Sequence, residues 1–589
     1  MDYSIKIGGE AGQGIQTIGD TLAKVFSRSG YHVFTHQDYE SRIRGGHNFY
    51  QVRFSEKGIS ASRRRVDIIV ALDRESITRH RDELSDNGVL IYDAADLKLV
   101  LEGDSFLDVP FTEIALRQGS KILANTVATG AVLGMLRVEL DIFEKIIDDT
   151  FRKKGDEIVE ANRRAARAGH DYAVRNCPKC AFIPSQFGRP KLLINGVEGI
   201  ALGALASGCR FYAAYPMTPS TGIMNYLAGK AKEYGLIVEQ AEDEIAAINM
   251  AIGASFAGVR AMTGTAGGGF ALMVEGLSLA GMTETPIVIA LGQRPAPATG
   301  LPTRTEQGDL LFAIHAAHGE FPRVVFAPGT PEQALFLTNK AFDLAEKYQI
   351  PTFVVFDQYL ADSAWTFDGF DVKRIRYRDY RIRGEEWRQV TAYKRHAFTD
   401  NGISPLGVPG QSKNLVVTDS DEHDEEGHII EDAETRVSMV QKRLLRKLPQ
   451  IRREIAPPLF YGEEGADTLL VCWGSLYGIV KEVVDALANV RKIGMLHFSE
   501  LFPLPVGSVA SAGDIPVPTG VRPETDFLSR LKEAKASLCV EQNATGQFER
   551  FFRAETGYAF DHAIHKYDGR PFTVEELLEK VSACLGRLL

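Results

Sequence analysis

Cysteine, long apolar runs and strongly basic stretches are all scarce in this chain of 589 residues. Six cysteines are too few for a secreted disulfide scaffold, so a reducing compartment fits better. No apolar run approaches the length of a membrane span, and the first residues, MDYSIKIGGEAGQG, lack a secretory signal. The net charge is −10, and no long basic run is present. We therefore expect a cytoplasmic protein that binds neither a membrane nor nucleic acid.

The only closely spaced cysteines are Cys177 and Cys180, in CPKC. The pair is open to three interpretations: half of a zinc site, a redox pair, or two free thiols in a linker. No second CxxC or His-x-x-His complements it, and no C-x₂-C-x₂-C run of the iron–sulfur type occurs. We therefore predict no metal site in this chain.

The first α/β domain is predicted over residues 1–175, since a chain of this length favours several domains. Residues 3–7 have a strand pattern, the glycine-rich GGEAGQG follows, and a helix with one apolar face ends near Gly30. Continuous apolar runs at 66–72 and 88–93 are typical of strands in a parallel sheet.

A proline-containing stretch at 176–191 has no helical or strand period, and we interpret it as a linker. A second α/β domain follows at 192–370, where strands alternate with helical patterns, which indicates a parallel sheet covered on both faces. Its strands are predicted at 210–214, 236–240, 259–263, 286–291, 323–327 and 352–356.

Residues 371–457 are dense in charge and are interpreted as an extended excursion followed by one helix. The acidic run DEHDEEG at 421–427 is a weak candidate for a metal site; a solvated loop or a basic partner surface is the favoured interpretation. A third α/β domain is predicted at 458–589, with strands at 467–473, 493–498 and 537–541.

Polar side chains follow three strands of the second domain, where an open parallel sheet binds its ligands. Thr218 follows strand 210–214, Glu244 follows strand 236–240, and Arg294 follows strand 286–291. Each has a structural alternative, because Thr218 or Ser220 could cap a helix, Glu244 could complement a helix dipole, and Arg294 could anchor a loop. Position alone leaves the choice open.

The ordered motifs YPMTPS, EDEIAAINMAIGAS, TGTAGGGFALMVEG and GQRPAPATGLPTRTEQGDLL resemble the pyrimidine-binding domain of 2-oxoacid:ferredoxin oxidoreductases. The resemblance continues through GISP and DEHDE to EQN and KYDGRPF, which are similar to the catalytic alpha subunit. GGEAGQG and RIRGGHNFYQVRFS resemble the gamma domain of that family, here fused ahead of the alpha part. The resemblance implies a multi-domain α/β protein of parallel sheets flanked by helices: a gamma domain, a thiamine pyrimidine-binding domain and a transketolase C-terminal-like domain.

The same resemblance assigns roles to these side chains. Glu244 would contact N1′ of thiamine diphosphate and promote removal of its C2 proton, which requires a carboxyl group whose burial raises its pKa. Arg294 and Thr218 would bind the carboxylate of the substrate. Tyr215 and Pro216, in YPMTPS, would line the cofactor.

This chain departs from the family pattern at 266–269, where AGGG replaces Ser-Gly-Pro-Gly and predicts a more flexible loop. It also has no GDG motif followed by Asn-Asn, and no cysteine cluster. In the family, the diphosphate with its Mg²⁺ and the [4Fe–4S] cluster belong to the beta subunit. We therefore expect a beta partner, ferredoxin as electron acceptor, and a dimer of heterodimers.

The glycine-rich turn of the first domain invites a nucleotide ligand, although its spacing is not G-x-G-x-x-G. The resemblance implies coenzyme A, with Gly12 and Gly14 in the turn and Arg42 and Arg44 near the phosphates. A domain that only docks on the catalytic part is the alternative. The expected reaction is CoA-acylating oxidation of a 2-oxoacid, 2-oxoglutarate rather than pyruvate or a branched-chain acid. A nicotinamide-dependent dehydrogenase and a non-catalytic assembly subunit are the rival functions.

Overall fold

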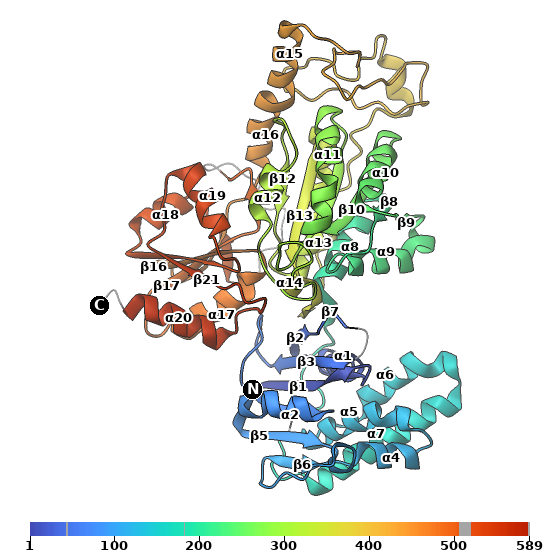
Figure 1. Cartoon of the computed structure of the whole chain (residues 1–589), viewed down its shortest axis with the longest axis vertical. Helices are drawn as coiled ribbons and strands as arrows, with labels where there is room; N and C mark the ends of the chain where they lie inside the picture. Colours follow the sequence, from blue (N-terminus) through green and yellow to red (C-terminus); the bar gives the residue numbers. More distant parts are fainter. Residues whose placement is uncertain (43–44, 182, 506–519, 587–589) are drawn as a thin grey trace. The chain divides into compact units, whose positions relative to one another are not determined.

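The computed structural model describes residues 1–42, 45–181, 183–505 and 520–586, and the chain forms two compact units. Unit 1 comprises Met1–Ile194, Asp362–Phe370 and Thr573–Leu577, and unit 2 the remaining residues. The five-part division expected from the sequence stays a prediction. Both units are α/β, as expected, and most of their helices and many of their strands are labelled in Figure 1.

Unit 1 is built on an eight-stranded sheet in the order β6-β5-β4-β1-β3-β2-β14-β7. Strands β1, β4, β5 and β6 are mutually parallel, which confirms the parallel arrangement expected for 66–72 and 88–93. Strands β2 and β3 run antiparallel to their neighbours, so the sheet is mixed. The strands are β1 Asp2–Ala11, β2 His32–Asp38, β3 Gly45–Ser55, β4 Val66–Ala71, β5 Leu84–Tyr92, β6 Phe106–Asp108, β7 Leu192–Asn195 and β14 Ala364–Phe367.

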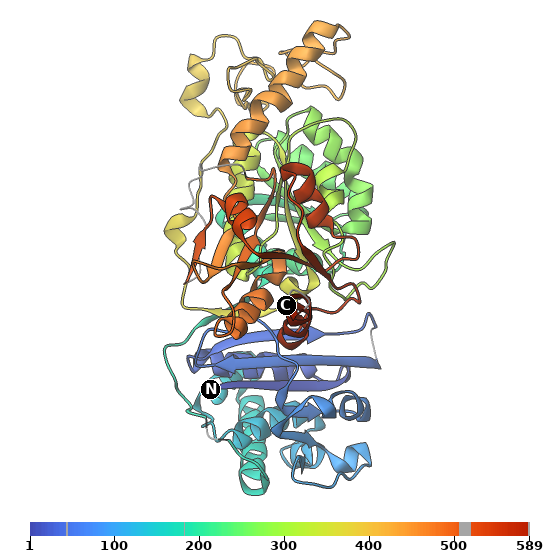
Figure 2. The ribbon, with the colours of Figure 1, turned by 90° about the vertical axis from the view of Figure 1, so that its left-hand side faces the viewer.

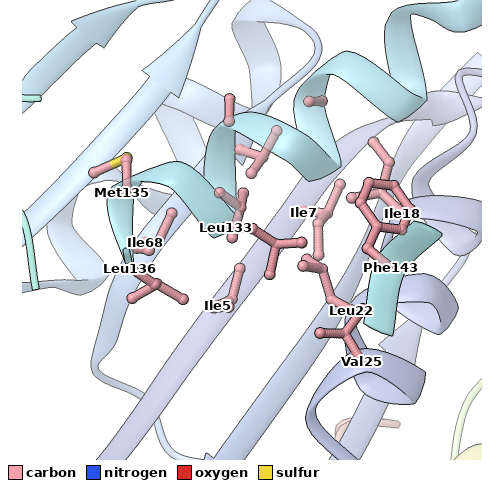
Figure 3. Packing of buried hydrophobic residues seen from close by; sticks show 14 of the residues in the cluster. Ile5, Ile7, Ile18, Leu22, Val25, Ile68, Leu133, Met135, Leu136 and Phe143 are labelled. Atoms are coloured by element: carbon pink, nitrogen blue, oxygen red, sulfur yellow. The ribbon is translucent and has the colours of Figure 1, made fainter. Parts of the chain in front are cut away.

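Helix α1 and the helices after β6 bury their apolar faces against this sheet. Figure 3 shows Ile18, Leu22 and Val25 of α1 facing Ile5 and Ile7 of β1. Gly30 follows α1 with φ +92°, the backbone region expected of a residue that ends a helix. The helices are α1 Ile15–Arg28, α2 Arg74–His80, α3 Ala94–Leu97, α4 Phe111–Arg117, α5 Ala124–Met135, α6 Asp141–Phe151 and α7 Asp156–Asn176.

The first sheet of unit 2 has the order β18-β12-β13-β11-β10-β8-β9 and is parallel apart from β18. Each of the six strands expected between 210 and 356 is present. They are β8 Cys209–Ala214, β9 Ile237–Gln240, β10 Arg260–Ala266, β11 Ile287–Gln293, β12 Val324–Phe326 and β13 Pro351–Asp357. The accompanying helices are α8 Gly196–Ala206, α9 Thr221–Tyr234, α10 Glu244–Phe256, α11 Gly267–Met282, α12 Leu310–His315, α13 Pro331–Tyr348 and α14 Gln358–Asp362.

The second sheet of unit 2 has the order β19-β15-β17-β16-β20-β21, and its strands include the three expected after residue 458. They are β15 Leu459–Gly462, β16 Thr468–Trp473, β17 Ile493–Phe498, β19 Val521–Pro523, β20 Ala536–Glu541 and β21 His562–His565. Its helices are α17 Tyr477–Leu487, α18 Phe527–Glu533, α19 Gln547–Thr556 and α20 Val574–Gly586. Strand β18, Glu500–Phe502, belongs to the first sheet.

The charged excursion ends in α15 (Ala433–Val440) and α16 (Lys447–Glu454), which a π-helical segment, Gln441–Arg446, joins into one rod (Figure 2). The acids of DEHDEEG pair within the chain: Glu422 with Arg443 at 2.7 Å and Glu425 with Lys394 at 2.9 Å. Glu422 and Glu425 are therefore paired within the chain. Among the described residues no cluster of His, Cys, Asp or Glu could hold a metal, and no helix is long and apolar enough to cross a membrane.

Candidate active site

The turn after β8 carries the first candidate residues, Tyr215 and Pro216, followed by Thr218. Tyr215 is 41% exposed, and Thr218 is half-buried. Ser220 takes the N-cap position of α9, but its hydroxyl donates to the carbonyl of Met217 at 2.8 Å and makes no capping bond. The capping interpretation of these hydroxyls is therefore wrong for Ser220, and Thr218 lies ahead of the cap.

Glu244 is the first residue of α10, directly beyond the carboxyl end of β9. The neighbouring Asp243 caps the helix, because its carboxylate accepts a hydrogen bond from the amide of Ala246 at 2.8 Å. Glu244 itself is only 3% exposed, and its Oε1 is buried without a hydrogen-bond partner among the described residues. A buried carboxylate oxygen left unpaired is costly, and such atoms usually await a ligand or water.

The first turn of α11 forms the wall against which Glu244 lies. A Cβ added at Gly269 would stand 2.4 Å from Oε1 of Glu244 and 2.2 Å from Oγ1 of Thr265. The prediction of a flexible loop at 266–269 is wrong, because Ala266 ends β10 and Gly267–Gly269 begin α11. Glycine is needed at position 269 because any side chain there would occupy the space of the Glu244 carboxylate.

Arg294 follows β11 and reaches the turn after β8. Its Nη1 donates to the backbone carbonyl of Thr218 at 2.9 Å, so the structure brings these two predicted residues together. The hydroxyl of Thr218 has no partner among the described residues. Burial lowers the pKa of Arg294, against the opposing effect of the nearby Asp309. The guanidinium nevertheless stays charged at neutral pH, because its pKa starts from 12.5.

Two further acids, Asp309 beside Arg294 and Glu306 near Asp309, were not identified from the sequence, although both lie in the quoted motif PTRTEQGDLL. Burial raises the pKa of Asp309 to about 6, with Arg294 opposing. Burial and then Asp309 raise the pKa of Glu306 to about 7. A Cβ at Gly267 would meet the Asp309 carboxylate at 2.6 Å, so this acid lies at the start of α11. Residue type alone carries no signal for such burial.

The motif EQN anchors the loop that carries these residues. Gln307 donates to the carbonyl of Trp473 at 2.9 Å and accepts from the amide of Gln542 at 3.0 Å. The carboxylate of Glu541 accepts from the side chain of Asn543 at 2.7 Å, which holds the motif in shape. EQN therefore orders the loop between Arg294 and Asp309 and is not itself exposed to a ligand.

In unit 1, Gly12 and Gly14 have φ of +96° and +84° and form the turn between β1 and α1. Both conformations favour glycine. A cavity of about 560 Å³ opens beside this turn, lined in part by Asp93, Lys121 and Asn125. Strands β1, β4 and β5 end here, the edge at which parallel sheets bind ligands.

Of the two arginines predicted for the same ligand, the structure describes only Arg42. Arg42 has a side chain 66% exposed, pairs with Glu40 at 3.0 Å, and is not among the residues lining the cavity. Arg44 lies outside the described residues. The structure therefore does not bring Arg42 to the Gly12 turn.

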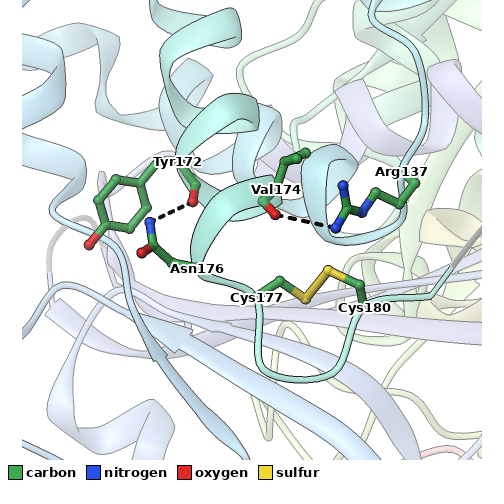
Figure 4. Close-up of a disulfide and its surroundings, with 6 residues drawn as sticks. All are labelled: Arg137, Tyr172, Val174, Asn176, Cys177 and Cys180. Carbon is green, nitrogen blue, oxygen red and sulfur yellow. Dashed lines mark hydrogen bonds between the residues drawn. A yellow bond between two sulfur atoms is a disulfide. The ribbon is translucent and has the colours of Figure 1, made fainter.

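Cys177 and Cys180 form a disulfide directly after α7 (Figure 4). The interpretation as two free thiols is wrong, and of the three alternatives the redox pair agrees with the bond. The remaining four cysteines, Cys209, Cys472, Cys539 and Cys584, are free.

Comparison with known proteins covers the whole chain. Residues 202–442 match the family described as "Pyruvate flavodoxin/ferredoxin oxidoreductase, thiamine diP-bdg", and residues 4–172 match "Pyruvate ferredoxin/flavodoxin oxidoreductase". The 2-oxoacid:ferredoxin oxidoreductase subunit alpha of Sulfolobus sp is 31% identical over 98% of this chain and 96% of its own length. The 2-oxoglutarate synthase subunit KorA of Methanocaldococcus jannaschii is 34% identical over 53% of this chain and 83% of its own.

One solved structure agrees over both units. The 2-oxoglutarate:ferredoxin oxidoreductase from Magnetococcus marinus, solved with 2-oxoglutarate, coenzyme A and succinyl-CoA bound, has a TM-score of 0.89 and 30% identity, covering 99% of both chains. The resemblance inferred from the motifs is thereby confirmed. With its gamma-like N-terminal part and its thiamine-diphosphate-binding domain, the chain belongs to the 2-oxoacid:ferredoxin oxidoreductases as an alpha subunit.

Proposed function

We propose that this alpha subunit supplies the aminopyrimidine and substrate contacts for CoA-acylating oxidative decarboxylation of a 2-oxoacid. The unpaired, buried Oε1 of Glu244 is the observation that carries the proposal. Thiamine diphosphate, when bound, supplies the electron sink for decarboxylation. Glu244 would hold a proton at the ring nitrogen N1′, and Gly269 keeps the space in which the carboxylate can do so. Tyr215 and Pro216 would line the ring.

Arg294 and Thr218 would bind the carboxylate that leaves as carbon dioxide. The guanidinium is fixed on one side by the carbonyl of Thr218, which leaves its other N–H groups to donate to a carboxylate. The free hydroxyl of Thr218 is a second donor on the same turn. Two converging donors suit a planar anion better than one.

An alpha subunit implies a beta partner, and the helices around Glu244 carry a surface suited to one. Ile245 and Met250 of α10 are 49% and 37% exposed, and Leu272 of α11 is 51% exposed. Large apolar side chains grouped beside a site favour a protein partner. We propose that the partner holds the diphosphate with Mg²⁺ and the [4Fe–4S] cluster, reduces ferredoxin, and assembles as a dimer of heterodimers.

Coenzyme A is the proposed acyl acceptor, with Gly12 and Gly14 at its site. Support comes from the cavity of about 560 Å³ beside this turn and from the Lys121 side chain in its wall. Arg42 and Arg44 are proposed only as outer contacts with phosphate. We propose that residues 1–175 form the gamma domain, residues 192–370 the pyrimidine-binding domain, and residues 458–589 the transketolase C-terminal-like domain.

We propose 2-oxoglutarate as the substrate. The Magnetococcus marinus enzyme named above contains 2-oxoglutarate and succinyl-CoA, and the Methanocaldococcus jannaschii relative is a 2-oxoglutarate synthase subunit. Pyruvate and branched-chain 2-oxoacids remain the alternatives, since the Sulfolobus relative is named only for 2-oxoacids.

Replacing one carboxylate at a time tests the proposal. Glu244→Gln in the assembled complex should lower turnover at least about 10²-fold, the usual scale for a lost acid–base group. Glu242→Gln is the matched control, because it removes the same charge from an exposed side chain of the same segment. Turnover is followed by reduction of a viologen dye with several 2-oxoacids. Full activity of Glu244→Gln in a correctly assembled complex would refute the assignment.

A further inference from the structure

The disulfide after α7 takes no part in the function proposed above, and its surroundings are unusual. Cys180 is exposed, whereas Cys177 is half-buried and packs against the hydrophobic core of unit 1. The two sulfurs therefore differ in access, and an incoming group would meet Cys180 first.

Arg175 and Lys179 lie two residues before and after Cys177 in the chain, and Figure 4 draws Arg137 beside the disulfide. None of the three forms an ion pair within the described residues. Arg137 donates to the carbonyl of Val174 at 3.2 Å, as Figure 4 shows; Arg175 donates to the carbonyl of Asp171 at 3.1 Å. Lys179, between the cysteines, donates to the hydroxyl of Ser105 at 3.2 Å. These acceptors are neutral, and Lys179 also contacts the carbonyl of the exposed Asp86 at 3.5 Å. Reactive cysteines occur in such electropositive, partly exposed surroundings, where a thiolate is stabilised.

A cavity of about 700 Å³ opens beside Cys180 and is lined by Tyr3, Met135 and Lys179 among others. Three acids lie in its wall: two are paired with arginines, and Asp86 is exposed. Asp2 pairs with Arg53 at 2.7 Å, and Asp67 pairs with Arg63 at 3.0 Å. The cavity therefore offers a reactant space next to the exposed sulfur.

The chain on either side of the disulfide is held independently of it. The amide of Cys177 donates to Ala173 at 2.9 Å, ending α7, and the amide of Ala181 donates to the carbonyl of Met135 at 3.1 Å. Opening the bond would leave both anchors in place. The two thiols would stay within reach of each other, which makes the reaction reversible.

From these contacts we infer that Cys177 and Cys180 form a thiol–disulfide exchange site that reacts with a dithiol. One thiolate of the dithiol attacks Sγ of Cys180, the S–S bond breaks, and Cys177 leaves as a thiolate that takes a proton from water. The second thiol of the reductant then attacks the mixed disulfide and releases Cys180. Two electrons pass to the cystine, which is reduced, while the dithiol is oxidised to its own disulfide.

Thiol counting on the native complex tests this inference without reference to turnover. The complex is kept in thiol-free aerated buffer, quenched in acid and alkylated, and the peptides are weighed. Four of the six cysteines of this chain should be labelled, with Cys177 and Cys180 protected. After native incubation with reduced dithiothreitol both should be labelled, whereas partly exposed Cys584 is labelled throughout. Labelling of both in aerated buffer, or protection that persists until the protein is denatured, overturns the inference.

Charge variants test the role of the cations. Replacing Arg137, Arg175 and Lys179 together by Gln should slow reduction by dithiothreitol at least roughly threefold, since the leaving thiolate loses its stabilisation. Arg117→Gln removes an exposed cation that is paired with Glu113 elsewhere in the unit and should not change the rate. Equal rates for the triple variant and wild type would refute the electrostatic account. Cys177→Ser should leave Cys180 as a single thiol that attacks 2-hydroxyethyl disulfide, keeps one half as a stable mixed disulfide and releases 2-mercaptoethanol; failure to do so would also count against the site.

Discussion

A single methyl group at Gly269 should disable the active site. An alanine Cβ there would stand 2.4 Å from Oε1 of Glu244, while ordinary contact begins at 3.4 Å, so the carboxylate must move by about 1 Å. Oγ1 of Thr265, at 2.2 Å from the same Cβ, blocks the alternative of shifting the helix toward β10. Crowding of this kind costs about 1–3 kcal/mol in a packed core.

The catalytic effect should exceed the effect on stability. Displacing a reacting group by about 1 Å can cost roughly 10²-fold in rate, so Gly269→Ala should lower turnover by about that factor. Gly268→Ala is the matched control in the same helical turn, because the nearest atom to its Cβ is the carbonyl of Ala298 at 3.7 Å. Both substitutions gain the same helix propensity, so their difference isolates the contact with Glu244.

Dye reduction by the assembled complex measures turnover, and calorimetry measures the affinity for thiamine diphosphate. Gly268→Ala should stay within about twofold of wild type, since the nearest atom to its Cβ lies at an ordinary contact distance. If Gly269→Ala kept both the turnover and the cofactor affinity of this control, Glu244 would not be confined as the structure indicates. The assignment of the cofactor carboxylate would then be wrong.

The remaining predictions concern three other places. Arg294→Lys should lower kcat/KM about 10- to 100-fold for every 2-oxoacid, and Thr218→Val less; a defect confined to 2-oxoglutarate would move Arg294 to the distal carboxylate. Replacing Arg42 and Arg44 by Ala should raise KM for coenzyme A more than KM for the 2-oxoacid, and an unchanged CoA dependence would favour a domain that only docks. Burial raises the pKa of Asp309 from 3.8 to about 6, so the stability linked to its neutral form is full below the unfolded pKa and is lost as pH rises through about 6. Asp309→Asn should therefore raise the thermal midpoint at pH 8, with a gain of roughly 3 kcal/mol that shrinks toward pH 4; an equal gain at both pH values would contradict the raised pKa.

The strands were largely predictable from the sequence, because buried parallel strands are continuous apolar runs. Segments such as 210–214 and 286–291 differ from β8 and β11 by at most two residues at each end. The flanks of such runs are also readable, which is why the positions of Thr218, Glu244 and Arg294 at strand ends agree with the structure. The structure of the excursion at 371–457 was harder to predict from the sequence, because contacts such as the Glu422–Arg443 ion pair join residues outside any periodic pattern.

By itself, the sequence determined the α/β class, the strand positions and the family, since each depends on local periodicity or on ordered motifs. Only the tertiary structure decided which polar atoms are left unpaired. The orphaned oxygen of Glu244, the bond from Arg294 to Thr218 and the buried Asp309 arise from segments that are distant in the chain and packed together. The burial that raises the pKa of Asp309 depends on neighbours in space. Residue type and spacing carry no record of them.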